Sequence, residues 1–223
     1  MGVYVPPTLT VDAIIFQLQN DKLHILLLQR ARAPFKGNWA LPGGYNPEGE
    51  TTRQALGRIL KAKTGVDIET QLGVLEQLYT FDDVGRDPRG HAIAVAYMGV
   101  GRDIHPGGSD TQNPVFFPVD GLPKLAYDHS EIISYALKRL QMRVLQTNIV
   151  FAMLPPVFTF SQLQTAYEAV LLRPLDKRNF RKRILNLGLV RETGLVEKSG
   201  AHRPARLYEF VQRSLRDIVD PLA

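Results

Sequence analysis

The chain has 223 residues, 44% of them apolar and 22% charged, with a net charge of +5 and no cysteine. This composition suits one large or two modest globular domains, and the absence of cysteine excludes disulfides, thiolate zinc sites and a cysteine nucleophile. No apolar run reaches the roughly 18 residues that a membrane span needs, and residues 1–10 lack the features of a signal peptide. We therefore expect a cytoplasmic protein with no membrane partner.

The positive charge is concentrated in one region. Residues 1–150 carry 15 basic and 15 acidic side chains, whereas residues 151–210 carry 10 basic and 5 acidic side chains. Basic charge gathered in one segment favours a polyanion as partner, although a solvated basic surface would also explain charge alone.

The first half of the chain carries the signals of a mixed α/β domain. Apolar runs at residues 9–16 and 23–28, separated by the polar residues 19–22, predict two strands joined by a tight turn. Further strands are predicted at residues 72–80, 91–99 and 114–119.

Two helices are predicted in the same half. Thr51-x-x-Gln54 is a capping-box pattern, and the helical stretch that follows it is stopped by Gly65. Asp128-x-x-Glu131 begins a second amphipathic helix that reaches about Leu145.

A junction is predicted within residues 148–158, which contain Pro155-Pro156. Adjacent prolines break a helix and stiffen a linker. The predicted domains are therefore residues 1–150 and 151–223, with the second unit beginning near Thr159.

Residues 44–66 match the motif of a known family with its spacing kept throughout. The matching residues are Gly44, Glu50, Arg58, Leu60, Gly65 and Val66. In the Nudix hydrolases these positions belong to the pattern G-x5-E-x7-R-E-U-x-E-E-x-G-U, where U is a bulky apolar residue. Residues 8–145 therefore resemble a Nudix domain, and the resemblance implies that Glu50 and Arg58 brace the loop against the helix.

The chain departs from this pattern at the metal-binding positions. The glutamates that hold Mg²⁺ in the family correspond here to Ile59, Ala62 and Lys63. None of these side chains offers the oxygen that Mg²⁺ requires, and an ammonium repels the ion. We therefore expect no metal, no cofactor, no catalytic residue and no hydrolase activity. His91 and His129 lack the spacing of a metal pair and are expected to serve packing or hydrogen bonding.

The ligand pocket that the resemblance implies is expected to survive without the metal. The Gly43-Gly44 loop should bring backbone N–H groups towards the N-terminus of the helix, which favours an anion. A lysine and three arginines would add phosphate contacts, although a surface salt bridge competes for each arginine taken alone. The predicted ligand-binding residues are Arg30, Gly43, Gly44, Lys63, Arg86 and Arg89.

The second half of the chain predicts two helices and a hairpin. Thr159-x-x-Gln162 opens a helix through about Leu172, and Asp176 caps a second helix that ends before Gly188. Two strands around a polar tip at residues 199–202 follow. A hairpin after a basic second helix is typical of a winged helix, in which that helix enters the major groove of DNA and the wing contacts phosphate or the minor groove.

The second of these helices has one apolar and one basic face. Phe180, Ile184 and Leu187 recur at helical spacing and are expected to dock against the rest of the unit. The predicted DNA-binding residues are Lys177, Arg178, Arg181 and Lys182 in the helix and Arg203 and Arg206 in the wing. The two helix arginines of this set are expected to read base edges, and Lys182 and the wing arginines to contact phosphate.

The whole arrangement resembles the Nudix-related transcriptional regulators (NrtR-like). The resemblance implies an α+β protein, a Nudix-type α/β/α sandwich with a C-terminal winged helix-turn-helix domain. It further implies a repressor of NAD-metabolism genes, controlled by ADP-ribose or a related nucleotide, and a homodimer that binds a palindromic operator in double-stranded DNA. Some relatives sense sugars. The alternatives are a Nudix hydrolase with an unusual metal site and an accessory domain, and a protein-interaction adaptor.

Overall fold

A seven-stranded mixed sheet forms the centre of the first half of the chain. This computed structural model describes residues 5–107, 113–197 and 204–218. The strands of the sheet are β1 (Thr8–Gln19), β2 (Lys22–Gln29), β3 (Trp39–Ala40), β4 (Gly43–Tyr45), β5 (Leu72–Phe81), β6 (Ala92–Gly101) and β7 (Pro114–Pro118). They lie in the order β3-β2-β1-β6-β5, with β4 paired to β1 and β7 to β2. The β1–β6 pair is parallel and the others are antiparallel.

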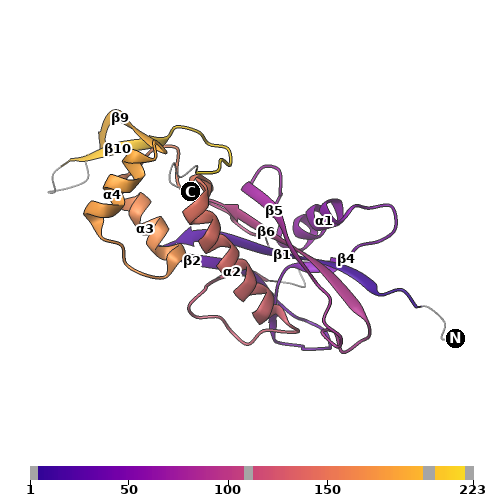
Figure 1. Ribbon diagram of the computed structural model, residues 1–223. Helices are drawn as coiled ribbons and strands as arrows, with labels where there is room; N and C mark the ends of the chain where they lie inside the picture. The colour runs from indigo at the N-terminus through magenta and orange to yellow at the C-terminus, as the bar shows by residue number, and fades with distance from the viewer. Residues whose placement is uncertain (1–4, 108–112, 198–203, 219–223) are drawn as a thin grey trace.

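Two helices cover the two faces of this sheet (Figure 1). Ile15 of β1 lies in the core beneath α1 (Thr52–Thr64), whereas its neighbours Ile14 and Phe16 lie in the core beneath α2 (His129–Gln146). Successive side chains of a strand point to opposite faces, so an apolar run in β1 matches burial on both. The predicted Nudix-type sandwich is confirmed. In the part of the chain that the structure describes, no helix is long and apolar enough to span a bilayer.

Both predicted capping boxes form. The side chain of Thr51 accepts a hydrogen bond from the amide of Gln54, and the Gln54 side chain accepts one from the amide of Thr51. Thr159 and Gln162 make the same pair of bonds at the start of α3 (Phe160–Leu171). The four residues therefore fix the first turns of α1 and α3 where the sequence places them.

The predicted hairpin turn is confirmed, while the start of α2 is held in a way that the sequence does not indicate. Asn20 and Asp21 adopt φ values of 49° and 62°, as a two-residue hairpin turn requires. The predicted start of α2 at Asp128 is confirmed, but the Asp128 side chain makes no capping hydrogen bond to the helix. Its carboxylate accepts two hydrogen bonds from Arg86, which lies in the loop after β5.

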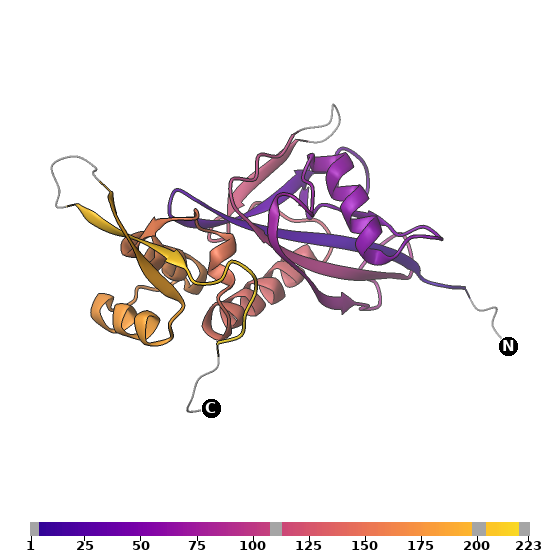
Figure 2. The same ribbon diagram turned by 90° about the horizontal axis from the view of Figure 1, so that it is seen from above.

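The second half of the chain forms the predicted winged helix. α4 spans Lys177–Asn186, and a three-stranded sheet lies beside it in the order β8 (Phe158–Thr159), β10 (Ala205–Phe210) and β9 (Val190–Glu197). Figure 2 shows this unit at one end of the central sheet. The predicted polar tip of the wing and Arg203 lie outside the described residues.

The segment between the two halves is a packed joint, and the expected stiff linker is wrong. Residues 149–154, which begin with the short helix η1 (Ile149–Ala152), are all buried in the same apolar core as Ile14 and Phe158. Burial of six consecutive apolar side chains stabilises a packed segment, so residues 149–154 do not form an exposed spacer. The two halves therefore share one core, and the division at residue 150 stays a prediction.

Residues 211–218 return to this joint. The Asn148 amide group donates hydrogen bonds to the carbonyl oxygens of Gln212 and Ser214, and its side-chain oxygen accepts one from the amide of Arg216. Arg213 donates to carbonyl oxygens of residues 151–155. The segment after the wing is thus tied to the end of α2 and to η1.

Candidate functional site

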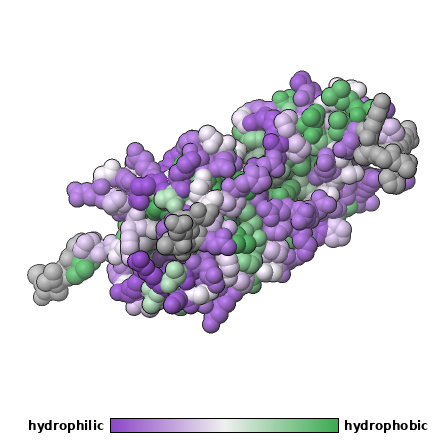
Figure 3. Space-filling model, turned by 180° about the vertical axis from the view of Figure 1, so that it is seen from behind, coloured by the Kyte–Doolittle hydropathy of each residue, from purple (hydrophilic) through white to green (hydrophobic). Residues whose placement is uncertain are grey.

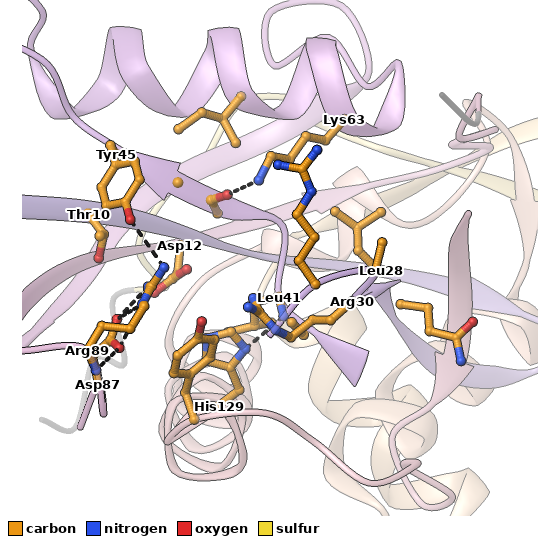
Figure 4. A pocket seen from close by; sticks show the side chains of 18 of the residues that line it. Thr10, Asp12, Leu28, Arg30, Leu41, Tyr45, Lys63, Asp87, Arg89 and His129 are labelled. Atoms are coloured by element: carbon orange, nitrogen blue, oxygen red, sulfur yellow. Dashed lines mark hydrogen bonds and ion pairs between the residues drawn. The ribbon is translucent and has the colours of Figure 1, made fainter. Parts of the chain in front are cut away.

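A cavity of about 720 Å³ opens on the central sheet beside α1 (Figure 4). All six residues predicted from the sequence to bind a ligand line it: Arg30, Gly43, Gly44, Lys63, Arg86 and Arg89. They come from β4, α1 and two loops, so the fold brings together residues that are far apart in the chain. The cavity is also lined by Arg32 and Arg58, against the two carboxylates of Asp12 and Asp87. This excess of positive charge favours an anionic ligand.

The floor of the cavity is a buried ion network around Arg86. Its guanidinium donates two hydrogen bonds of 2.8 Å to Asp128 and lies 3.8 Å from the Asp12 carboxylate. Only 6% of the Arg86 side chain is exposed, so Asp128 occupies the donors that the sequence assigned to a ligand phosphate. Burial raises the pKa of Asp12 to about 7, with Arg86 opposing the rise and Asp128 adding to it. The charge of the floor therefore changes near neutral pH.

Two of the replaced metal positions close the site to a cation. Ile59 is buried, and a Cβ added to Gly44 would stand 3.2 Å from its Cδ1 atom. The Lys63 ammonium donates a hydrogen bond of 2.6 Å to the carbonyl oxygen of Gly43. Burial lowers the pKa of Lys63, and Asp12 opposes this effect. These residues do not fit Mg²⁺, because none supplies an oxygen and an ammonium lies where a ligand would be needed.

The two glycines lie in strand β4, and the expected loop beside the N-terminus of α1 is wrong. Gly43 pairs with Asp12 and Gly44 pairs with Val11 of β1. A Cβ at Gly43 would come within 2.0 Å of the Asp12 carboxylate, so glycine is required there for close approach. Gly44 instead faces Ile59 in the second half of α1.

Aromatic rings and guanidinium groups form one wall of the cavity. The Arg30 guanidinium lies 4.7 Å from the centre of the Tyr127 ring, and that of Arg89 lies 5.6 Å from the same ring. Asp87 and the Tyr45 hydroxyl hold Arg89 in place. The Tyr127 hydroxyl is buried without a hydrogen-bond partner among the described residues, and Tyr127 has a φ of 54°. Buried hydroxyls without a partner and residues with left-handed backbone are common at ligand sites. There a ligand can supply the missing hydrogen-bond partner.

Two structural roles expected from the sequence are confirmed. The Nδ1 atom of buried His129 accepts a hydrogen bond of 2.9 Å from the Leu41 amide, and burial lowers the pKa of His129 to about 3. Arg58 donates to both carboxylate oxygens of Glu50 and to the carbonyl oxygen of Tyr45. Glu50 and Arg58 therefore brace the segment between β4 and α1.

The basic residues of α4 form a second candidate site, at the other end of the molecule. Lys177, Arg178 and Lys182 are exposed, whereas Phe180 and Ile184 are buried against the rest of the winged helix. The predicted docking face is thus confirmed, and three of the four predicted helix residues are open to a partner. An exposed basic face on a docked second helix has the form of a recognition helix.

Arg181 is placed differently from the expected free side chain. Its guanidinium lies 4.5 Å from the centre of the Phe160 ring and donates a hydrogen bond to the Tyr208 hydroxyl. Phe160 begins α3 and Tyr208 lies in β10. Arg181 therefore fastens the recognition helix to the wing sheet, and its predicted contact with a base stays a prediction.

The wing carries both charge and exposed apolar surface. Arg206 of β10 is exposed and pairs with Glu192 of β9 at 3.0 Å. Figure 3 shows apolar residues gathered at this end of the molecule, and β9 contributes Leu195 and Val196, which are 57% and 48% exposed. Arg206 donates to Glu192 through Nη1, so a phosphate contact through its other nitrogens can form beside this bond.

Among the cavity residues that sequence reasoning missed, three have polar or aromatic side chains in its floor or walls: Asp12, Tyr45 and Tyr127. Asp12 had a usable signal, because it is the one carboxylate inside the apolar run of residues 11–16. The two tyrosines had none, since their role depends on Arg30 and Arg89 reaching them from other loops.

Comparison with known proteins agrees with the two halves of the fold. A family model for the NUDIX domain matches residues 8–136, and one for the NrtR DNA-binding winged helix domain matches residues 150–210. The ADPR responsive transcriptional repressor NtrR of Acinetobacter baylyi is 33% identical over 213 residues, which cover 93% of this chain and 83% of that protein. This chain belongs to the NrtR family.

Two further similarities bear on this NrtR-family chain. The crystal structure of Shewanella oneidensis NrtR complexed with a 27mer DNA has a TM-score of 0.74 and 32% identity, covering 91% of this chain and 93% of that one. The ADP-ribose pyrophosphatase of Methanocaldococcus jannaschii is 40% identical over 135 residues, covering 59% of this chain and 73% of that protein. The Nudix half of this chain is thus also similar to a pyrophosphatase.

Proposed function

We propose that this chain is a transcriptional repressor that binds double-stranded DNA through its winged helix and responds to ADP-ribose bound in its Nudix domain. The observation that carries the proposal is the large cavity, where cationic side chains remain around a metal site whose ligands are replaced. Such a cavity suits a diphosphate. The A. baylyi relative, named as ADPR responsive, matches most of the chain and supports the same ligand.

The DNA half of the proposal rests on α4 and the wing. Lys177, Arg178 and Lys182 are exposed, and neutralising phosphates with such side chains releases counterions. The S. oneidensis relative was solved with DNA, which supports the same use of this unit. The proposal includes a homodimer and a palindromic operator, because two recognition helices related by a two-fold axis would read two half-sites. It also includes target genes of NAD metabolism, which the family resemblance implies.

The proposal makes the Nudix domain a sensor and not a hydrolase. Ile59, Ala62 and Lys63 supply no oxygen, and in the ranges that the structure describes no three His, Asp or Glu side chains are grouped to hold an ion. Hydrolysis of ADP-ribose is the second candidate, favoured by the 40% identity with a pyrophosphatase. With ADP-ribose and Mg²⁺ we expect no AMP above a control without protein, and clear metal-dependent turnover would overturn the sensor assignment.

A gel-shift assay on the promoter region of the chain's own gene tests the repressor assignment. It is repeated with ADP-ribose, NAD, nicotinamide mononucleotide and pentoses. We expect salt-sensitive binding that ADP-ribose releases. Release by a sugar alone would contradict the effector and leave the repressor assignment standing. Absence of salt-sensitive binding to any duplex would favour a protein-interaction adaptor.

A further inference from the structure

A second cavity lies where the Nudix half meets the winged helix. Its volume is about 200 Å³, and it shares no lining residue with the larger cavity. Helices α2, α3 and α4 form its walls, and Ile218 from the returning segment completes them. Its apolar lining comes from Val144, Leu145, Leu171, Leu175, Phe180, Ile184, Leu187 and Ile218.

One polar group in this lining is incompletely satisfied. Tyr167 of α3 is only 5% exposed, and its hydroxyl has no hydrogen-bond partner among the described residues. A buried hydroxyl without a partner is unfavourable and rare in native proteins. Burial raises the pKa of Tyr167, so the group is a neutral donor. As a donor, the hydroxyl can be completed by an acceptor bound in the cavity that Tyr167 lines.

The charged residues of the lining favour an anion. Arg173 and Arg183 both line the cavity, and Arg183 partly offsets the pKa rise of Tyr167. The acidic residue of the lining, Asp176, already caps α4 by accepting a hydrogen bond from the Asn179 amide. An occupant with a carboxylate would therefore meet two guanidinium groups and a hydroxyl donor.

We propose that this joint cavity binds a small monocarboxylate with an aromatic or branched aliphatic body. A volume of about 200 Å³ leaves room for one ring with a carboxylate attached, and two of the lining residues, Arg173 and Arg183, are themselves exposed. The body packs among the aliphatic side chains of α2 and α4, and the carboxylate accepts hydrogen bonds from Tyr167 and Arg183. The occupant touches both halves of the molecule at once.

Calorimetric titration of the full chain with benzoate tests this site. Acetate, which lacks the apolar body, and benzyl alcohol, which lacks the charge, are each expected to bind at least about tenfold more weakly than benzoate. Tyr167→Phe and Arg183→Gln are each expected to weaken benzoate about tenfold. Arg178→Gln, an equal loss of charge on an exposed position of the same helix, should leave benzoate binding unchanged.

Three results would overturn the site. Benzoate that binds no more tightly than acetate, or that is insensitive to both Tyr167→Phe and Arg183→Gln, shows that the cavity does not select an apolar carboxylate. Loss of benzoate binding in the presence of saturating ADP-ribose would place the molecule in the larger cavity instead. Thermal unfolding of each variant checks that it is folded. Titration with benzoate alone needs neither DNA nor ADP-ribose, so failure here leaves the proposed function untouched.

Discussion

The Lys63 ammonium lies 2.6 Å from the carbonyl oxygen of Gly43 and donates a hydrogen bond to it. One residue thereby does two things to the Nudix site. It removes an oxygen that Mg²⁺ would need, and it adds a positive charge beside the strand that lines the cavity. The same substitution that withholds an oxygen from Mg²⁺ therefore offers an ammonium to an anion.

Lys63→Met should weaken the binding of ADP-ribose about tenfold, because a charge-assisted contact with a phosphate is lost while the length of the side chain is kept. Calorimetric titration measures the effect. Lys61→Met is the matched control, since Lys61 lies on the same helix but is exposed and pairs with Asp67. If both variants weaken ADP-ribose binding equally, the effect comes from the lower net charge of the protein and not from a contact made by Lys63.

The pKa of Asp12 makes ligand binding depend on pH. Burial raises this pKa from 3.8 to about 7, so Asp12 is protonated below that pH and negatively charged above it. A negative charge on the floor repels an anion, and ADP-ribose should therefore bind about threefold more tightly at about pH 6 than at about pH 8. Asp12→Asn should abolish this difference, and a difference that survives the substitution would assign it to another group.

The same carboxyl has an effect on stability of known sign. The folded state keeps a proton that the unfolded chain releases, so the free energy of unfolding should fall as pH rises from about 4 to about 7. Urea unfolding of the wild type and of Asp12→Asn at several pH values measures this. Between about pH 4 and about pH 7 the free energy of unfolding of the wild type should fall relative to that of the variant. Above this range the difference between the two proteins should stay constant.

His129 acts in the opposite direction. Burial lowers its pKa from 6.5 to about 3, so the unfolded chain takes up a proton that the folded state does not. The stability that this group contributes is complete above pH 6.5 and is lost as pH falls towards about 3. His129→Asn offers an oxygen to the Leu41 amide without titrating there, and it should flatten acid unfolding. A variant as acid-sensitive as the wild type would contradict this.

Arg181→Ala should lower the free energy of unfolding by about 1 to 2 kcal/mol, because it removes the packing on Phe160 and the hydrogen bond to Tyr208. Arg178→Ala is the control. Its side chain is exposed, so its stability should change by less than about 0.5 kcal/mol. If the two variants are equally stable, Arg181 does not fasten the helix to the wing.

DNA titrations at several salt concentrations separate the roles of the exposed cations. Lys182→Ala should weaken operator and random DNA alike and flatten the salt slope by about one unit. Arg206→Ala should do less, because the Glu192 carboxylate beside Arg206 offsets part of its charge. Arg178→Ala should instead narrow the gap between operator and random DNA by about 1 to 3 kcal/mol. Unchanged affinity in all three variants would contradict the proposed interface.

Local signals account for the parts of the fold that the sequence predicts. Thr51 and Thr159 begin helices because their hydroxyls pair with an amide three residues on, and Asn20 and Asp21 turn the chain because they tolerate positive φ. These interactions join residues within four positions of each other, so they can be predicted from the sequence without knowledge of the fold. The cationic lining of the cavity is also recovered: Lys63 lies within the Nudix motif, and Arg30, Arg86 and Arg89 lie in the segments that the resemblance places beside it.

The structural roles that the sequence does not predict depend on contacts between residues that are distant in the sequence. Arg86 and Asp128 are 42 residues apart, and their pairing turns a predicted ligand residue into part of the cavity floor. Arg181 follows the expected helical spacing, but Phe160 and Tyr208 reach its guanidinium from other elements. At the joint, Pro155-Pro156 predict a linker, whereas the six apolar residues before them are buried against elements distant in the sequence, α2 and α3 among them.

The bonds of Asn148 set an order for biosynthesis. Its side chain is held by Gln212, Ser214 and Arg216, which the ribosome adds more than sixty residues later. A nascent chain that has exposed both halves but not these residues has a joint whose hydrogen bonds are still made to water. The two halves are then joined by their shared apolar core, and the hydrogen bonds of the joint are complete only after residue 216 has emerged from the exit tunnel.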